Sequence, residues 1–330
     1  MEPRPAPGGD ISTANVHVGA CSWTDPALVA SGWYPQGARD AEGRLRHYAS
    51  RFPLVEVDST FYALPTERVA KLWVERTPDD FVLDVKAFAL FTGHSARSSA
   101  LPRELRPAAG DRSRVRRRDL APEVLDELWR LFHAGIAPLR EAGRLGSVLF
   151  QFSPWLAPDA RARALVEECR ERAGAPLSVE FRHPGWFAPH QLPYTIDFLR
   201  ERQIPLVAVD TAQGLPSSLP PVAEATSEEL AVVRFHGRSP QWGTGNKEES
   251  YRHRYTREEL SAWVPRVQAL AERAQRVHVL FNNCCATASV EAAETMRDLL
   301  GQGAEAGPGP ELGGTSPDDG MRGGDAGFLW

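Results

Sequence analysis

Short apolar runs alternate along this chain with amphipathic segments. Eight runs rich in Val, Leu and Phe predict β-strands, at residues 16–21, 54–58, 81–86, 147–152, 177–181, 205–210, 231–236 and 277–282. Seven further segments repeat apolar residues every three or four positions and predict helices, at residues 44–52, 66–76, 122–143, 158–174, 195–203, 257–274 and 290–300. This alternation is typical of parallel strands joined by right-handed helical crossovers.

Eight parallel strands can close into a barrel, so we predict an α/β fold with a single TIM-barrel-like (β/α)8 domain over residues 15–300. The rival is a doubly wound open sheet, but no GxGxxG fingerprint follows the first strand. The two ends, residues 1–14 and 301–330, are rich in Pro and Gly. They contain too few apolar residues to offset the entropy of ordering, so we expect both to be disordered.

One connection is unusually long. Residues 89–121, after the third strand, show no convincing core segment and include the run DRSRVRRRD at 111–119. An insertion of this length inside a compact domain is typical of a lid, a binding loop or a disordered segment. A solvated loop is the default expectation for this basic run. It could also hold an anionic polymer through Arg112, Arg114, Arg116, Arg117 and Arg118.

Composition and charge narrow the class of protein. The chain has 330 residues of which 42% are hydrophobic, enough for a sizeable core, and its net charge of -5 gives no overall electrostatic case for binding nucleic acid. No apolar run approaches the roughly 20 residues that span a bilayer. The first residues also lack the apolar stretch of a secretory signal, so we expect a cytoplasmic protein without a membrane partner.

The four cysteines, Cys21, Cys169, Cys284 and Cys285, show no CxxC spacing and are too few for a disulfide scaffold. Cys21 ends the first strand, and Cys284 and Cys285 follow the eighth, which is its neighbour in a closed barrel. Their thiols could therefore meet for redox chemistry or soft-metal binding, although reduced thiols without a role are favoured.

Charged residues occur where parallel strands should be apolar. Residues two apart on a strand share a face, and four such pairs lie near the strand ends: Glu56 with Asp58, Asp84 with Lys86, Glu180 with Arg182, and Arg234 with His236. Gln151, Asp210 and Asn282 end their strands in equivalent places. Because an unpaired buried charge costs several kcal/mol, these groups either form a satisfied ion-pair network or line a wet cleft. We favour a cleft, at the C-terminal face where barrel active sites lie.

With the strands laid out, the chain resembles the YecE-like family, the domain-of-unknown-function family 72. The matching stretches include VGACSWTDP (18–26), DVKAFALFTGH (84–94), VEFRHPGW (179–186), VVRFHGR (232–238) and VHVLFNN (277–283). The resemblance covers residues 16–300 and implies a TIM-barrel-like fold, but no established reaction. The segment CCATASVEAA after the last strand departs from the family pattern, which leaves the role of that loop open.

Five strand-end residues are candidates for catalysis. Glu180 could be a general base, although a Glu–Arg ion pair is the structural alternative. Lys86 could be a base, a Schiff-base former or an anion clamp, or it could pair with Asp84, Glu56 or Asp58. His236 precedes a glycine and suits acid–base work, although a hydrogen-bonded core histidine is nearly as plausible. The full catalytic set is Glu180, Lys86, His236, Asp210 and Glu56.

A second set of residues is expected to hold the substrate. Arg182 could bind a phosphate or carboxylate through two hydrogen bonds, and His183 begins the loop after it. Aromatic residues in strand-end loops could form a rim for a ring-shaped ligand, or they could anchor the loops. The full binding set is Arg182, His183, Asp58, Gln151, Trp23, Tyr62, Trp186, Asn282 and Asn283.

These residues support an enzyme that uses acid–base or hydrolytic chemistry on a small polar, anionic substrate. One alternative is a metal-dependent phosphoesterase acting on nucleic acid; another is a non-catalytic polyanion- or nucleic-acid-binding module that uses residues 111–119. A divalent ion could bind among the carboxylates and histidines, but no HxH or HExxH motif is present, so no metal ligand is assigned.

Overall fold

The computed structural model describes residues 13–243 and 247–303. Its main sheet has eight parallel strands in the order β7-β6-β3-β2-β1-β10-β9-β8. All eight predicted strands are confirmed, as β1 (Val16–Cys21), β2 (Leu54–Val57), β3 (Val82–Lys86), β6 (Leu145–Gln151), β7 (Leu177–Glu180), β8 (Val207–Thr211), β9 (Leu230–Gly237) and β10 (Arg276–Phe281). The predicted disordered ends, 1–14 and 301–330, lie almost entirely outside the described residues.

The sheet curls until its edge strands β7 and β8 nearly meet, which gives the predicted TIM-barrel-like fold. One parallel bridge joins them, between Val179 and Leu206, with the amide of Val179 donating to the carbonyl of Pro205 at 2.9 Å. Pro205 has no N–H to give to the ladder, and the amide of Leu206 donates instead to the hydroxyl of Thr226 at 2.8 Å. The seam therefore has few strand-to-strand hydrogen bonds.

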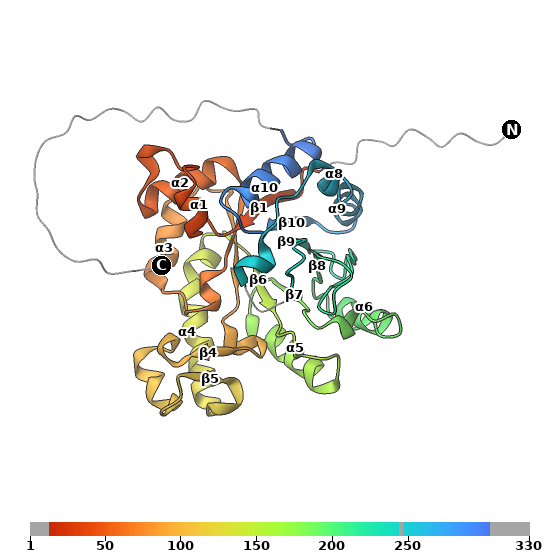
Figure 1. The fold of residues 1–330 in the computed structure, drawn as a ribbon. Coiled ribbons are helices and arrows are strands. Elements are labelled where there is room, and N and C mark those ends of the chain that lie inside the picture. The colour runs from red at the N-terminus through yellow and green to blue at the C-terminus, as the bar shows by residue number, and fades with distance from the viewer. Residues whose placement is uncertain (1–12, 244–246, 304–330) are drawn as a thin grey trace, which may run out of the picture.

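Helices surround the sheet (Figure 1), and their bounds follow local sequence signals. Asp40, Thr66 and Asp159 cap the helices that follow them, because each side chain accepts a hydrogen bond from a backbone amide of the first turn. The helices are α1 (Pro26–Ala30), α2 (Ala41–Arg51), α3 (Glu67–Glu75), α4 (Pro122–Glu141), α5 (Ala160–Ala173), α6 (Leu192–Arg200), α7 (Lys247–Tyr251), α8 (Arg257–Ser261), α9 (Val264–Ala271) and α10 (Ala288–Leu299).

The single helix predicted over 257–274 is wrong, because the segment forms two helices, α8 and α9. Pro265 lies in the first turn of α9, where its missing N–H is tolerated. In a continuous helix the same proline would remove a hydrogen bond and clash with the preceding turn. The remaining six predicted helices are confirmed, with ends shifted by a few residues.

The long insertion is ordered, which corrects the expectation that residues 89–121 lack a core segment. Strands β4 (Ser95–Arg97) and β5 (Arg114–Arg116) pair antiparallel as a separate two-stranded sheet beside α4 and α5 (Figure 1). Leu101 and Val115 are almost completely buried there. Strands of three residues are too short to show a period in the sequence, so only the fold reveals them.

We predict that Gly19 is required where β1 approaches β2. A Cβ at Gly19 would lie 1.9 Å from the carbonyl oxygen of Leu54, and the hydroxyl of Tyr48 bridges the same strands by bonding Ala20 N and Leu54 O. Gly19→Ala should lower the free energy of unfolding in urea by about 2 kcal/mol, as overpacking does. Gly37→Ala, where an added Cβ meets nothing within 4 Å, is the control. Equal stability of the two variants would contradict this account.

Candidate active site at the strand ends

A buried guanidinium lies at the centre of the candidate site. Arg234, on β9, donates from Nη2 to Glu56 Oε1 at 2.7 Å and from Nη1 to Glu180 Oε2 at 2.5 Å. Glu56 and Glu180 come from β2 and β7, so the contacts cross the interior of the barrel. All three side chains are 0% exposed. Each charge therefore depends on the others, because removing one partner would leave an uncompensated buried ion.

His236 completes this buried network as a neutral ring. Its Nδ1 lies 3.0 Å from Nδ2 of the Asn282 side chain, and its Nε2 lies 3.1 Å from both Glu180 Oε1 and Arg182 Nη1. The side-chain amide nitrogen of Asn282 can only donate, so Nδ1 accepts its hydrogen. Burial, together with the charges of Arg182 and Arg234, lowers the pKa of His236 to about 3 even though Glu180 opposes the shift.

The pKa values of the two carboxyl groups in the network are shifted in opposite directions. Burial raises the pKa of Glu56, because the charges of Arg234 and Lys86 offset only part of the desolvation cost. Burial acts on Glu180 in the same direction, but the charges around it, led by Arg234, hold its pKa well below the usual value. The second oxygen of Glu56 has no hydrogen-bond partner among the described residues. We call Glu56, Glu180, Arg234 and His236 the inner layer.

The inner layer corrects one expectation from the sequence. Glu56, Glu180 and His236 do converge near the strand ends, as predicted, but they are fully buried rather than lining an open cleft. These residues form the ion-pair network that was the structural alternative, because their ion pairs and hydrogen bonds offset the cost of desolvating them.

A more accessible group of residues lies next to the inner layer. Arg182 donates from Nη1 to Glu180 Oε1 at 2.7 Å and from Nη2 to the hydroxyl of Tyr251 at 3.0 Å. Its guanidinium also lies 4.9 Å from the ring centre of Trp242, which stacks against His236. Trp242 and Tyr251 belong to the connection after β9 and were not predicted. No periodic pattern marks them, because Trp242 lies outside any helix or strand and Tyr251 ends α7, a helix of five residues that is too short to show a period.

Lys86, Asp58 and Gln151 are partly exposed at the same strand ends. The ammonium of Lys86 lies 4.6 Å from the ring centre of Phe61, and no described carboxylate lies within ion-pair distance of it. The expected pairing with Asp84 is not formed, because Asp84 contacts the buried His278 at 2.9 Å instead. We call the partly exposed set the outer layer: Lys86, Asp58, Gln151, Arg182 and Tyr251.

Asp210 lies away from these layers. It pairs in register with Phe235, so it faces the helices, while the neighbouring Arg234 faces the barrel interior. Its oxygens accept hydrogen bonds from Arg238, Tyr255 and Trp263 at 2.8–2.9 Å. The prediction that it ends its strand in a place equivalent to Asn282 is therefore wrong, and its contacts fix α8 and α9 to the barrel.

The predicted aromatic rim is only partly present. Trp186 is 1% exposed, stacks on Phe181 and donates from its indole to the carbonyl of Leu156 at 2.7 Å. Trp23 is also buried and packs edge-on against Trp73. Both rings therefore anchor loops, which corrects their assignment to ligand binding.

Three other predicted binding residues lie around the strand ends. Tyr62 is 53% exposed. His183 is partly exposed and accepts the amide hydrogen of Gly185 through Nδ1, which caps its own loop. Asn283 is buried and donates to the carbonyl of His253 at 2.9 Å. Tyr62 and His183 remain candidates for ligand contacts, whereas Asn283 supports the backbone.

The structure adds no support for thiol chemistry at the cysteines or for a metal site among the described residues. Cys21 faces Arg234 at 3.5 Å, and burial raises its pKa well above the usual value, which favours the thiol. Cys284 lies in the loop after β10, and burial raises its pKa to about 11. Across residues 13–243 and 247–303, no group of three or more His, Cys, Asp or Glu side chains is arranged to hold a metal ion. None of those described helices is long and apolar enough to cross a membrane.

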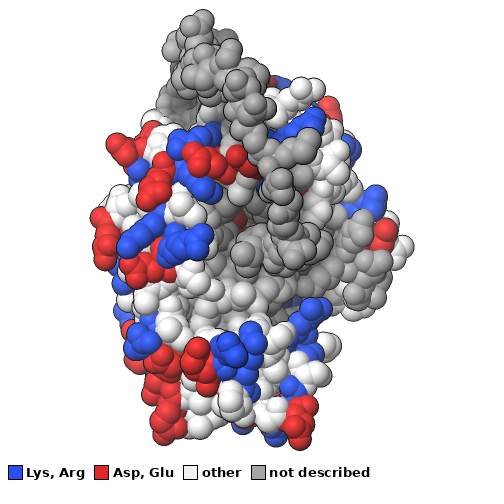
Figure 2. Space-filling model, turned by 90° about the vertical axis from the view of Figure 1, so that its left-hand side faces the viewer, with Lys and Arg blue, Asp and Glu red and all other residues white. Residues whose placement is uncertain are grey.

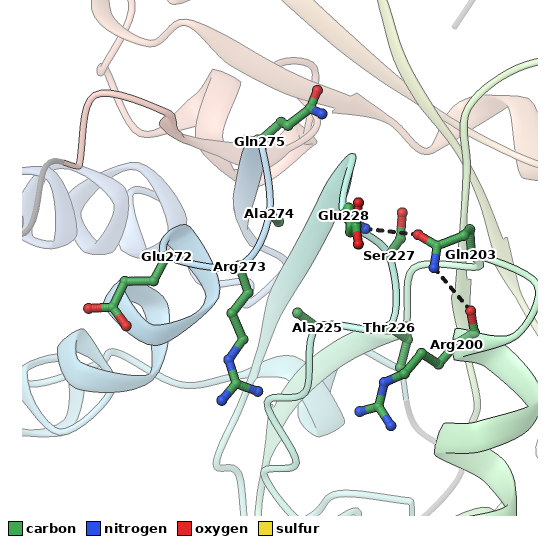
Figure 3. A pocket seen from close by; sticks show the side chains of 10 residues that line it. All are labelled: Arg200, Gln203, Ala225, Thr226, Ser227, Glu228, Glu272, Arg273, Ala274 and Gln275. Carbon is green, nitrogen blue, oxygen red and sulfur yellow. Dashed lines mark hydrogen bonds between the residues drawn. The ribbon is translucent and has the colours of Figure 1, made fainter.

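A cleft of about 690 Å³ lies near the opposite end of the barrel, below the starts of β9 and β10 (Figure 3). Arg200 and Arg273 extend toward the same side of it, and Gln203 bonds the amide of Glu228 and the carbonyl of Arg200. Because barrel enzymes place their chemistry at the C-terminal ends of the strands, we do not assign the active site to this cleft.

Fold and site together define an α/β protein of the TIM-barrel class with a buried ion-pair network near the strand ends. The chain belongs to the family described as "Protein of unknown function DUF72", which matches residues 17–313. This confirms the family and the fold that the sequence motifs indicated.

Relatives of this family are similar over most of their length. The UPF0759 protein YunF of Bacillus subtilis (strain 168) is 29% identical over 292 residues, which are 86% of this chain and 94% of YunF. The crystal structure of a DUF72 family protein from Thermotoga maritima MSB8 has 27% identity and a TM-score of 0.69, covering 87% of this chain and 99% of that one. A DUF72 family protein from Enterococcus faecalis V583 has 24% identity and a TM-score of 0.68, covering 87% and 97%.

The neutral His236 predicts a pH dependence of stability. Its pKa is about 3 in the folded protein and near 6.5 in the unfolded chain, so between these values the unfolded chain binds more protons. Stability is then full above pH 6.5 and falls as the pH drops toward 3. His236→Gln should flatten this slope in urea unfolding at several pH values, whereas exposed His190→Gln should not. An unchanged slope in His236→Gln would show that this ring is not the source.

Proposed function

We propose that this protein is an enzyme that binds a small anionic substrate over the outer layer and uses acid–base chemistry there. The single observation that carries the proposal is the ammonium of Lys86, which lies at a strand end without a carboxylate partner among the described residues. The guanidinium groups of Arg182 and Arg234 are already paired with carboxylates. Lys86 is therefore the cation of this site that is left to bind a ligand.

The choice of a lysine at this position supports a chemical role. The chain contains 35 arginines but three lysines, at positions 71, 86 and 247. An arginine keeps its proton at all relevant pH values, whereas a lysine is a compact charge that can also give a proton up. Its neighbour Asp58 has a pKa raised by burial, which the charge of Lys86 offsets only partly. The anchor for an anion thus lies beside a titratable carboxyl, as acid–base chemistry requires.

Replacing Lys86 should remove the anion site while leaving the fold intact. In Lys86→Met an unbranched aliphatic side chain remains, but the ammonium and its contact with the ring of Phe61 are lost. We expect sulfate and inorganic phosphate to raise the Tm of the wild type and to bind Lys86→Met at least about tenfold more weakly, or about 1.4 kcal/mol. Thermal shift and calorimetric titration measure both effects.

Lys71→Met is the matched control, because Lys71 is an exposed lysine on α3 that pairs with Glu67 at 2.6 Å. It should respond to the anions as the wild type does. If Lys86→Met keeps the full response, or if the wild type shows no saturable binding of either anion, the proposal fails.

The basic insertion supports a second candidate, a polyanion-binding surface. Residues 95–119 contain eight arginines and three acidic residues in a chain of net charge -5. Arg117 is already paired with Glu168 at 2.5 Å, and charges of both signs are interspersed over the face shown in Figure 2. This candidate is therefore weaker than the strand-end site.

A charge-reversal test separates it from the first proposal. Exposed Arg114, Arg116 and Arg118 would be replaced together by Glu, and retention on heparin would be measured against salt concentration. If the insertion binds polyanions, elution should shift to much lower salt, because each lost contact reduces the salt dependence. Unchanged elution excludes the insertion as the binding surface.

A further inference from the structure

A second polar group of the outer layer has hydrogen-bonding capacity left over. The hydroxyl of Tyr251 accepts a hydrogen bond from Arg182 Nη2 at 3.0 Å. No described residue accepts the proton of this hydroxyl. A phenol that accepts from a cation and donates to nothing in the protein is arranged to donate to a ligand. The backbone of Tyr251 is fixed from the other side, because its carbonyl accepts the amide hydrogen of Cys284 at 2.9 Å.

We propose that Tyr251 is the catalytic residue that exchanges a proton with an oxygen of the anionic substrate held by Lys86. This inference rests on the proposed function and adds the group that carries the proton. In the step, the O–H bond of the phenol breaks as an O–H bond forms on the substrate oxygen, which leaves a phenolate beside Arg182. The reverse transfer restores the phenol, so no further reactant is needed.

The surroundings of Tyr251 support both of its protonation states. Burial opposes the phenolate, but the charges of Arg182 and Lys86 outweigh burial and lower the pKa of Tyr251. The ring is held in place by Trp242 and His236, whose ring centres lie 5.4 and 5.9 Å from its own. A residue that is fixed in space and whose lowered pKa eases the loss of its proton is suited to proton transfer.

The other groups nearby are less suited to this role. His236 is fully buried, and both of its ring nitrogens are used by Asn282 and Glu180. Arg182 does not lose its proton in proteins. Asp58 carries a titratable carboxyl that is hydrogen-bonded by its own backbone and by no described side chain, whereas Tyr251 is oriented by Arg182 and Trp242.

The proposal predicts that anion binding and the ionisation of Tyr251 are coupled. An anion at Lys86 adds negative charge beside the phenol, so it must disfavour the phenolate. At alkaline pH, adding sulfate, which itself takes up no proton there, should convert phenolate to phenol. The loss of phenolate absorbance should saturate at the same sulfate concentration as binding measured by calorimetry.

Three proteins test this coupling: the wild type, Tyr251→Phe, and Tyr194→Phe as a control for an exposed tyrosine that is 71% accessible. Without sulfate, Tyr251→Phe should lack the tyrosine that ionises at the lowest pH, and Tyr194→Phe should retain it. With sulfate, Tyr251→Phe should bind no more than about tenfold more weakly, the value of one hydrogen bond, and show no absorbance change. Tyr194→Phe should behave as the wild type does.

The outcomes separate the two claims. If sulfate binds and the absorbance change persists in Tyr251→Phe, or is absent from the wild type, the role of Tyr251 is overturned while the anion site stands. If Tyr251→Phe and the wild type have identical tyrosine titrations without sulfate, the role of Tyr251 is likewise overturned. If the wild type binds neither sulfate nor inorganic phosphate, the anion site itself fails.

Discussion

The structure depends on one buried cation. Arg234 lies in the interior of the barrel, and its desolvation is offset by Glu56 and Glu180 from two other strands. Such an arrangement is weak evidence for stability, because a well-packed apolar core would often serve as well. The main effect of the network is to hold side chains from different strands in fixed positions. The network spans the barrel interior between β2, β7 and β9, and it fixes Glu180, to which Arg182 and His236 are bonded.

This network divides the site into a fully buried part and a partly exposed part. The inner layer satisfies most of its hydrogen bonds internally, and its neutral histidine adds no charge. The outer layer is built on it but keeps groups that the protein does not use, the ammonium of Lys86 and the proton of Tyr251. A site of this kind can bind a ligand without disturbing the buried charges, because the binding groups are additional to those that hold the barrel together.

The sequence predicted the eight strands, and the two-residue period placed Arg234 with His236 on one face. It did not supply the register between strands, so Asp210 was placed with the interior groups although it faces the helices. It also did not distinguish a fully buried network from an open cleft, because that depends on side-chain packing. Tyr251 was missed because it reaches the site from a connecting segment, where no periodic pattern predicts direction.

The most direct test of the account is the anomalous diffraction of crystals soaked in bromide. A partly exposed outer layer whose ammonium is paired with no described carboxylate predicts a bromide peak in contact with Lys86 Nζ and Tyr251 Oη, while the inner layer stays free of bromide. A peak confined to the surface arginines, or a Lys86 ammonium found paired with a carboxylate, would contradict it.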